Sequence, residues 1–111
     1  MGRIVIVAFK PKPGKTDALR ALVAKHWRIL HGEGLVTDRE AWIMEAAGGI
    51  IIEVFEWKSA DAIAQAHTNP VVGEMWVQFG EVCEYVPLAR IPEATNLFAE
   101  FEGVVLSPDS H

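Results

Sequence analysis

The chain is poor in cysteine and in basic residues, and each shortage removes a class of protein. Its single cysteine, Cys83, excludes an intramolecular disulfide and a thiolate metal site. Ten lysines and arginines against fifteen aspartates and glutamates give a net charge of −5, which argues against nucleic acid and anionic membranes as partners. No apolar run approaches the ~20 residues of a membrane span. No dinucleotide fingerprint, phosphate loop, nucleophile elbow or zinc spacing occurs, so we expect neither a cofactor nor a metal.

Hydrophobic residues make up 50% of the 111 residues, which is enough to form a folded core. This length fits one domain, which we place at residues 1–103, followed by a C-terminal tail at 104–111. The N-terminus, Met1-Gly2-Arg3, leads into a strand pattern without the cleavage site of a secretory signal. Together with the lone cysteine, this favours a reducing, cytoplasmic location.

A strand and a helix are predicted in the first third of the chain. The β-branched run Ile4–Phe9 predicts a strand, which ends in the turn Lys10–Gly14. A helix is expected to begin near Thr16 or Asp17 and to end at His31-Gly32. The apolar face of this helix consists of Leu19, Leu22, Val23, His26 and Leu30.

Two more strands are predicted, at Ala41–Ala46 and Ile50–Trp57, joined by a hairpin at Ala47-Gly48-Gly49. Ser59 is a good N-cap for a helical segment at Ala60–Ala66.

Asn69-Pro70 then predicts a new helix, with asparagine as cap and proline as first helical residue. Its apolar stripe runs through Val72, Met75, Trp76, Phe79, Val82, Cys83 and Val86. A last strand is predicted at Asn96–Glu102.

The order β-α-β-β-α-β predicts an α+β, ferredoxin-like domain with a four-stranded antiparallel sheet and two helices on one face. Ile4–Phe9 and Ile50–Phe55 are apolar on both faces apart from Glu53, although the face without helices is normally solvated. We therefore expect a homodimer that packs sheet against sheet. The alternative is that short central strands are deeply buried within one chain.

These motifs resemble the antibiotic-biosynthesis monooxygenase family of the dimeric α/β-barrel superfamily over residues 3–103. The residues that carry the resemblance are Pro13-Gly14, Trp57-Lys58-Ser59, Ala62, His67 and Pro70. The resemblance implies a dimeric α/β barrel with a pocket between sheet and helices, lined by Trp57. It also implies a cofactor-independent monooxygenase that acts on a small, flat phenolic, quinol or polyketide-like substrate.

Two positions depart from the anthrone-oxidising members of this family. Glu53 stands where those members have asparagine, and Ile63 stands at the position of their pocket tyrosine. The residues of the haem-degrading members are missing at the corresponding positions, which are Ala8 or Val7, Ala66 and Trp76, so haem degradation is not expected.

Glu53, His26 and His67 are the candidate catalytic residues. Strand alternation places Glu53 on the same face as Phe55 and Trp57, where a desolvated carboxylate suits a general base. His26, on the apolar face of its helix, is placed to meet Glu53 across the pocket, and His67 lies in the family motif.

Each candidate also has a structural interpretation. Glu53 could form a buried pair with Arg90, Arg28 or a histidine, His26 could be a hydrogen-bonded core residue, and His67 could cap a carbonyl. The candidate substrate-binding residues are Trp57, Phe55, Trp76, Phe79 and Tyr85, since aromatic rings stack on a flat ligand. Trp27 and Trp42 are assigned to ordinary core packing.

The favoured function is proton abstraction from a small aromatic molecule, followed by direct reaction with O₂. An isomerase or lyase would use the same base without oxygen. A non-catalytic ligand-binding dimer would have a pocket filled by side chains and Glu53 paired with an arginine.

Overall fold

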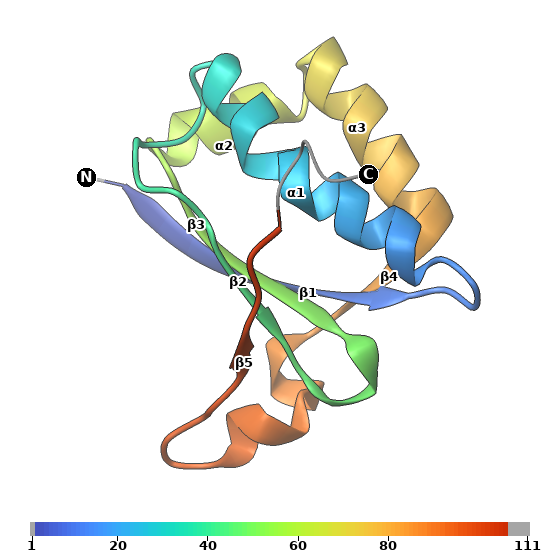
Figure 1. The fold of residues 1–111 in the computed structure, drawn as a ribbon. Helices are drawn as coiled ribbons and strands as arrows, with labels where there is room; N and C mark the ends of the chain where they lie inside the picture. Colours follow the sequence, from blue (N-terminus) through green and yellow to red (C-terminus); the bar gives the residue numbers. More distant parts are fainter. Residues whose placement is uncertain (1, 107–111) are drawn as a thin grey trace.

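Five strands form one open antiparallel sheet in the order β4-β1-β3-β2-β5, and three α-helices lie over one of its faces (Figure 1). The structure is a computed structural model and describes residues 2–106. The elements are β1 (Arg3–Pro11), α1 (Thr16–Gly32), β2 (Trp42–Glu45), β3 (Ile51–Trp57), α2 (Ala60–Ala66), α3 (Pro70–Val82), β4 (Cys83–Val86) and β5 (Glu102–Gly103). This α+β architecture is compatible with a ferredoxin-like fold. No helix within residues 2–106 has the length and apolar character needed to cross a membrane.

The two predicted helix caps are confirmed. The Ser59 hydroxyl accepts a hydrogen bond from the backbone N–H of Ala62 at 3.1 Å. The Asn69 side-chain oxygen accepts from Val71 and Val72 at 2.9 and 3.2 Å, and α3 begins with Pro70 as expected. These caps satisfy N–H groups that have no partner inside a helix, so both α2 and α3 begin where the local sequence dictates.

Removing the Asn69 cap has a defined cost. Asn69→Ala should lower the free energy of unfolding by about 1 kcal/mol, because two N–H groups of α3 lose their acceptor. Asn69→Ser is the matched control, since serine is an equally good cap, and it should stay near the wild-type value. Urea denaturation measures both; equal stability of the two variants would contradict a capping role.

The prediction that the second long helix continues to Val86 is wrong. Helix α3 ends at Val82, and Cys83 already has extended backbone angles (φ −149°, ψ 169°). Residues Cys83–Val86 form β4, which pairs with the second half of β1. Valine, cysteine and tyrosine fit a strand as well as a helix, and the unpaired edge of β1 decides between them.

The predicted last strand, Asn96–Glu102, is also wrong, and the sheet has five strands instead of four. Only Glu102–Gly103 forms a strand, β5, which pairs with Met44 and Glu45 of β2 at the sheet edge opposite β4. Short 3₁₀ turns at Leu88–Arg90 and Pro92–Thr95 precede it. Residues 96–101 of the expected strand are in no strand, and Leu97 among them is 94% exposed.

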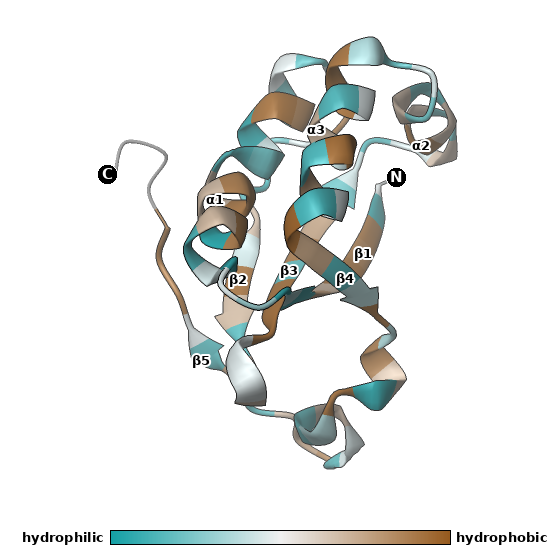
Figure 2. Cartoon of the chain, turned by 90° about the vertical axis from the view of Figure 1, so that its right-hand side faces the viewer, coloured by the Kyte–Doolittle hydropathy of each residue, from teal (hydrophilic) through white to brown (hydrophobic). Residues whose placement is uncertain are grey.

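The face of the sheet away from the helices is covered at one end only. There, Ala8 and Ile52 pack against Ile91 from the turn after β4, and all three are buried. At the other end Ile6 is 48% and Trp42 74% exposed, so the assignment of Trp42 to the core is wrong. Hydrophobic residues continue along β1 and β3 into this uncovered region (Figure 2).

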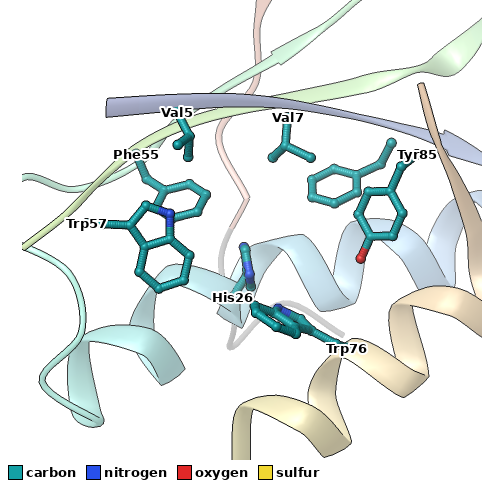
Figure 3. Close-up of a pocket in the computed structure, with 8 residues that line it drawn as sticks. Val5, Val7, His26, Phe55, Trp57, Trp76 and Tyr85 are labelled. Atoms are coloured by element: carbon teal, nitrogen blue, oxygen red, sulfur yellow. The ribbon is translucent and has the colours of Figure 1, made fainter. Parts of the chain in front are cut away.

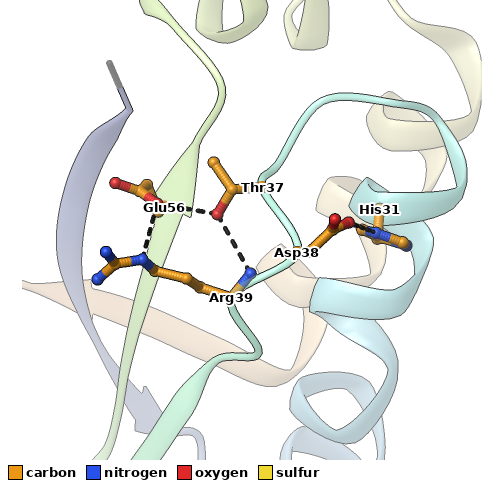
Figure 4. A network of polar contacts seen from close by, with 5 residues as sticks. All are labelled: His31, Thr37, Asp38, Arg39 and Glu56. Carbon is orange, nitrogen blue, oxygen red and sulfur yellow. Dashed lines mark hydrogen bonds and ion pairs between the residues drawn. The ribbon is translucent and has the colours of Figure 1, made fainter.

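A polar network fixes the loop between α1 and β2 against β3 (Figure 4). The Thr37 hydroxyl donates to Glu56 Oε1 at 2.9 Å, and Arg39 Nε lies 3.4 Å from the same oxygen. His31 Nε2 lies 2.8 Å from Asp38 Oδ1, and this hydrogen bond lowers the pKa of the Asp38 carboxyl. These contacts hold the loop beside the C-terminal end of β3.

Candidate active site

A pocket of about 450 Å³ opens between the sheet and the helices (Figure 3). The lining side chains come from β1, β3, β4, α1 and α3: Val5, Val7, Phe9, His26, Phe55, Trp57, Trp76 and Tyr85. Apolar and aromatic walls with a few polar groups are typical of small-molecule sites of this size. The pocket thus lies between the sheet and the two long helices, α1 and α3.

Four of the five predicted substrate-binding residues line this pocket: Phe55, Trp57, Trp76 and Tyr85. Phe79 is buried behind the wall, where it stacks on Phe9 with ring centroids 5.0 Å apart. Tyr85 lies on β4, opposite Phe9, and this pairing turns its ring toward the helices. Burial raises the pKa of the Tyr85 hydroxyl, so the phenol remains a neutral hydrogen-bond donor.

His26 and Glu53 form a buried hydrogen-bonded pair. Their atoms Nδ1 and Oε1 are 2.6 Å apart, and the two residues are 5% and 0% exposed. Glu53 thus pairs with a histidine and not with an arginine. His26 lines the pocket, whereas Glu53 does not and lies behind it, so the histidine is the group that can reach a ligand.

This geometry assigns different roles to the two side chains. An ionised carboxylate only accepts hydrogen bonds, so Nδ1 of His26 donates when Glu53 is ionised, and Nε2 of a neutral imidazole is then the free acceptor. An imidazole held in this tautomer is a ready proton acceptor. Glu53 is thus placed to orient the imidazole, and of the two groups that the sequence offered as a base, Glu53 or a histidine, only His26 lines the pocket.

Three aromatic rings surround the imidazole of His26. Phe9, Phe55 and Phe79 meet it edge-on, at centroid distances of 6.4, 5.4 and 5.1 Å. With Nδ1 held by Glu53, the ring has little freedom to rotate. The imidazole is thus held in place by Glu53 and three aromatic rings.

His67 lies outside this constellation. It is exposed at the C-terminal end of α2, where its ring meets Trp76 edge-on at 5.1 Å. The side chain supports the outer side of Trp76 and does not line the pocket. Within residues 2–106, no three histidine, cysteine, aspartate or glutamate side chains gather closely enough to hold a metal ion.

Val5, Val7 and Phe9 also line the pocket but were not predicted from the sequence. The strand period places these three on one face of β1, but Ile4–Phe9 is apolar on both faces, so only the pairing of Val5 with Phe55 and of Phe9 with Ile51 shows which face meets the pocket. Comparison of the chain with models of known protein families, with curated proteins and with solved structures gave no significant match.

The buried thiol of Cys83 should make the stability of the protein fall at high pH. It is 3% exposed, and burial raises the pKa of its thiol from 9.0 to about 11. The unfolded chain loses this proton near pH 9 while the folded chain retains it, so stability should fall between pH 9 and pH 11. Urea unfolding at pH 8 and pH 10.5 measures the loss, and Cys83→Ala should show a smaller one. An equal loss in both proteins would contradict the assignment to Cys83.

Proposed function

We propose that this protein is a cofactor-independent monooxygenase for a small, flat phenolic or quinol-like substrate, with His26 as general base and Glu53 as its positioning residue. The proposal rests on one observation above all: a 2.6 Å hydrogen bond between His26 and a fully buried Glu53, with His26 in the wall of an aromatic pocket. The resemblance to the antibiotic-biosynthesis monooxygenase family points in the same direction.

In this reaction, Nε2 of His26 takes a proton from the activated carbon or hydroxyl of the bound aromatic molecule. The resulting electron-rich anion reduces O₂ directly. One oxygen atom forms a carbonyl at the attacked carbon, and the other leaves as water with two hydrogens of the substrate: both from a CH₂ carbon in an anthrone-like substrate, or one from the ring carbon and one from the hydroxyl in a phenol. The substrate supplies all four electrons that O₂ takes up, so no separate reductant takes part.

The walls of the pocket suit such an intermediate. Trp57 and Trp76 offer indole faces on which a planar ring can stack, and Val5 and Val7 keep the site apolar. Tyr85 supplies a neutral hydroxyl that can donate to a carbonyl oxygen of the ligand. Exclusion of water strengthens the interaction between the anion and the protonated histidine.

Oxygen consumption is the direct test. A panel of anthrones, hydroquinones and simple phenols is incubated with the protein, and O₂ uptake and product are followed together. One O₂ consumed for each product molecule supports the proposal. Conversion of a substrate without O₂ uptake indicates an isomerase or lyase that uses the same pair, and binding without conversion indicates a ligand-binding protein; both results overturn the monooxygenase proposal.

We further propose that a second copy of the chain covers the open end of the sheet, as in a dimeric α/β barrel. The support is the exposed apolar side chains of Ile4 and Ile6 on β1 and of Trp42 on β2, the two strands that flank β3. Ile6→Glu should convert a micromolar dimer into a monomer in analytical ultracentrifugation, while Val77→Glu, on the exposed side of α3, should leave the dimer intact. A monomeric wild-type protein would refute the dimer.

A further inference from the structure

A second cavity lies on the opposite side of the His26–Glu53 pair from the aromatic pocket. It has a volume of about 300 Å³ and lies between α1, β2 and the segment 104–106, which runs from β5 past α1 (Figure 1). Glu53 forms part of its wall, whereas His26 lines only the aromatic pocket. The two cavities have no lining residue in common, so the pair separates them.

Two buried polar atoms belong to residues that line this second cavity and have no hydrogen-bond partner among residues 2–106. They are Oε2 of Glu53, an acceptor, and Nε1 of Trp27, a donor. Buried polar groups are nearly always hydrogen-bonded, to ordered water where no protein group is available. Water can accept from an indole and donate to a carboxylate, and the cavity exceeds the ~30 Å³ that one water molecule occupies in the liquid.

The surroundings of the second cavity are polar, in contrast to those of the aromatic pocket. Arg28 of α1 and Glu40 of the loop before β2 both line it, and both are exposed at the surface. The segment 104–106 closes another side, where the backbone N–H of Val104 donates to Ile43 at 2.9 Å. Charged side chains at its rim connect the cavity with solvent.

We infer that this cavity holds water and is the route by which the His26–Glu53 pair exchanges protons with solvent. The Nδ1 proton of His26 passes along the 2.6 Å hydrogen bond to the carboxylate of Glu53, leaves this carboxyl group to water in the cavity, and is replaced by a water proton that returns along the same path. The benefit of this route rests on the proposed function: the pair stays in equilibrium with solvent while substrate fills the aromatic pocket. The existence of the route does not depend on any substrate.

Two volume-adding substitutions separate this route from exchange through the aromatic pocket. Ala24→Leu fills the second cavity from α1, and Val7→Phe fills the aromatic pocket from β1. The exchange rate of the His26 Nδ1 proton with water, measured by NMR, should fall at least tenfold in Ala24→Leu and stay within twofold in Val7→Phe. If Ala24→Leu does not fold, Ala41→Leu adds the same volume from the loop side of the cavity.

The opposite pattern, slow exchange only in Val7→Phe, would overturn the inference, as would unchanged exchange in both variants. Water is detected directly through the Trp27 indole proton, which should give a cross-peak with solvent in the wild type and lose it in Ala24→Leu. A wild type without this cross-peak would contradict a water-filled cavity. Neither measurement uses substrate or O₂, so a failed oxygenation assay does not affect the result on proton exchange. A failed exchange measurement likewise does not affect the oxygenation assay.

Discussion

His26→Gln should lower kcat on the oxygenated substrate by a factor of about 10²–10⁴, with KM changed less than threefold. Glutamine can still hydrogen-bond to Glu53, so the buried carboxylate keeps a partner, but it cannot take a proton. The stacking surfaces of Trp57 and Trp76 remain, and they hold the ligand. The loss therefore falls on the chemical step, which is the signature of a group that acts in the transition state.

His67→Gln is the matched control for this substitution. It makes the same change at a histidine that is exposed at the end of α2 and does not line the pocket, and kcat should stay within twofold. Glu53→Gln should lower kcat as well, because a neutral amide no longer fixes one tautomer of His26. Its pH–rate profile should change shape, which a merely structural role would not produce. A kcat for His26→Gln within threefold of the wild type would contradict the assignment of the base.

The parts of the fold that depend on nearby residues could be predicted from the sequence. The start of α2 at Ser59 and that of α3 at Asn69 follow from side-chain oxygens that cap the next turn, and no distant contact is needed. The end of α3 and the position of β5 depend on strands far away in the chain. The residue pattern of Cys83–Val86 fits both the helical and the strand period. Only pairing with the free edge of β1 makes this segment a strand.

The same distinction applies to the site. Two periodicities, one in α1 and one in β3, placed His26 and Glu53 on facing surfaces, and the structure brings them to 2.6 Å. Which of the two side chains lines the pocket could not be predicted. It depends on the distance between α1 and the sheet and on the bulk of Phe9 and Phe79 beside the imidazole. This is why the carboxylate expected to face the ligand lies behind the histidine.

The second large effect concerns the stability of the buried pair. His26→Leu should lower the free energy of unfolding by about 3–5 kcal/mol, because it leaves the carboxylate of Glu53 buried without a partner. Glu53→Leu should cost about 1–3 kcal/mol, since the donor on His26 loses its acceptor. Urea denaturation of both variants gives these values under conditions where the wild type unfolds in one transition.

The double variant His26→Leu/Glu53→Leu decides what the pair is for. The imidazole is then gone from its surroundings of Phe9, Phe55 and Phe79, and no carboxylate is left buried without its partner, so the double variant should be as stable as the wild type or more so, by up to about 4 kcal/mol. The sum of the single losses then exceeds the loss in the double variant, which is the energetic coupling of the pair. A double variant as unstable as His26→Leu would show that the pair maintains the fold. A stable but inactive double variant would show instead that the two polar side chains do not stabilise the core. Their role would then be the proton transfer.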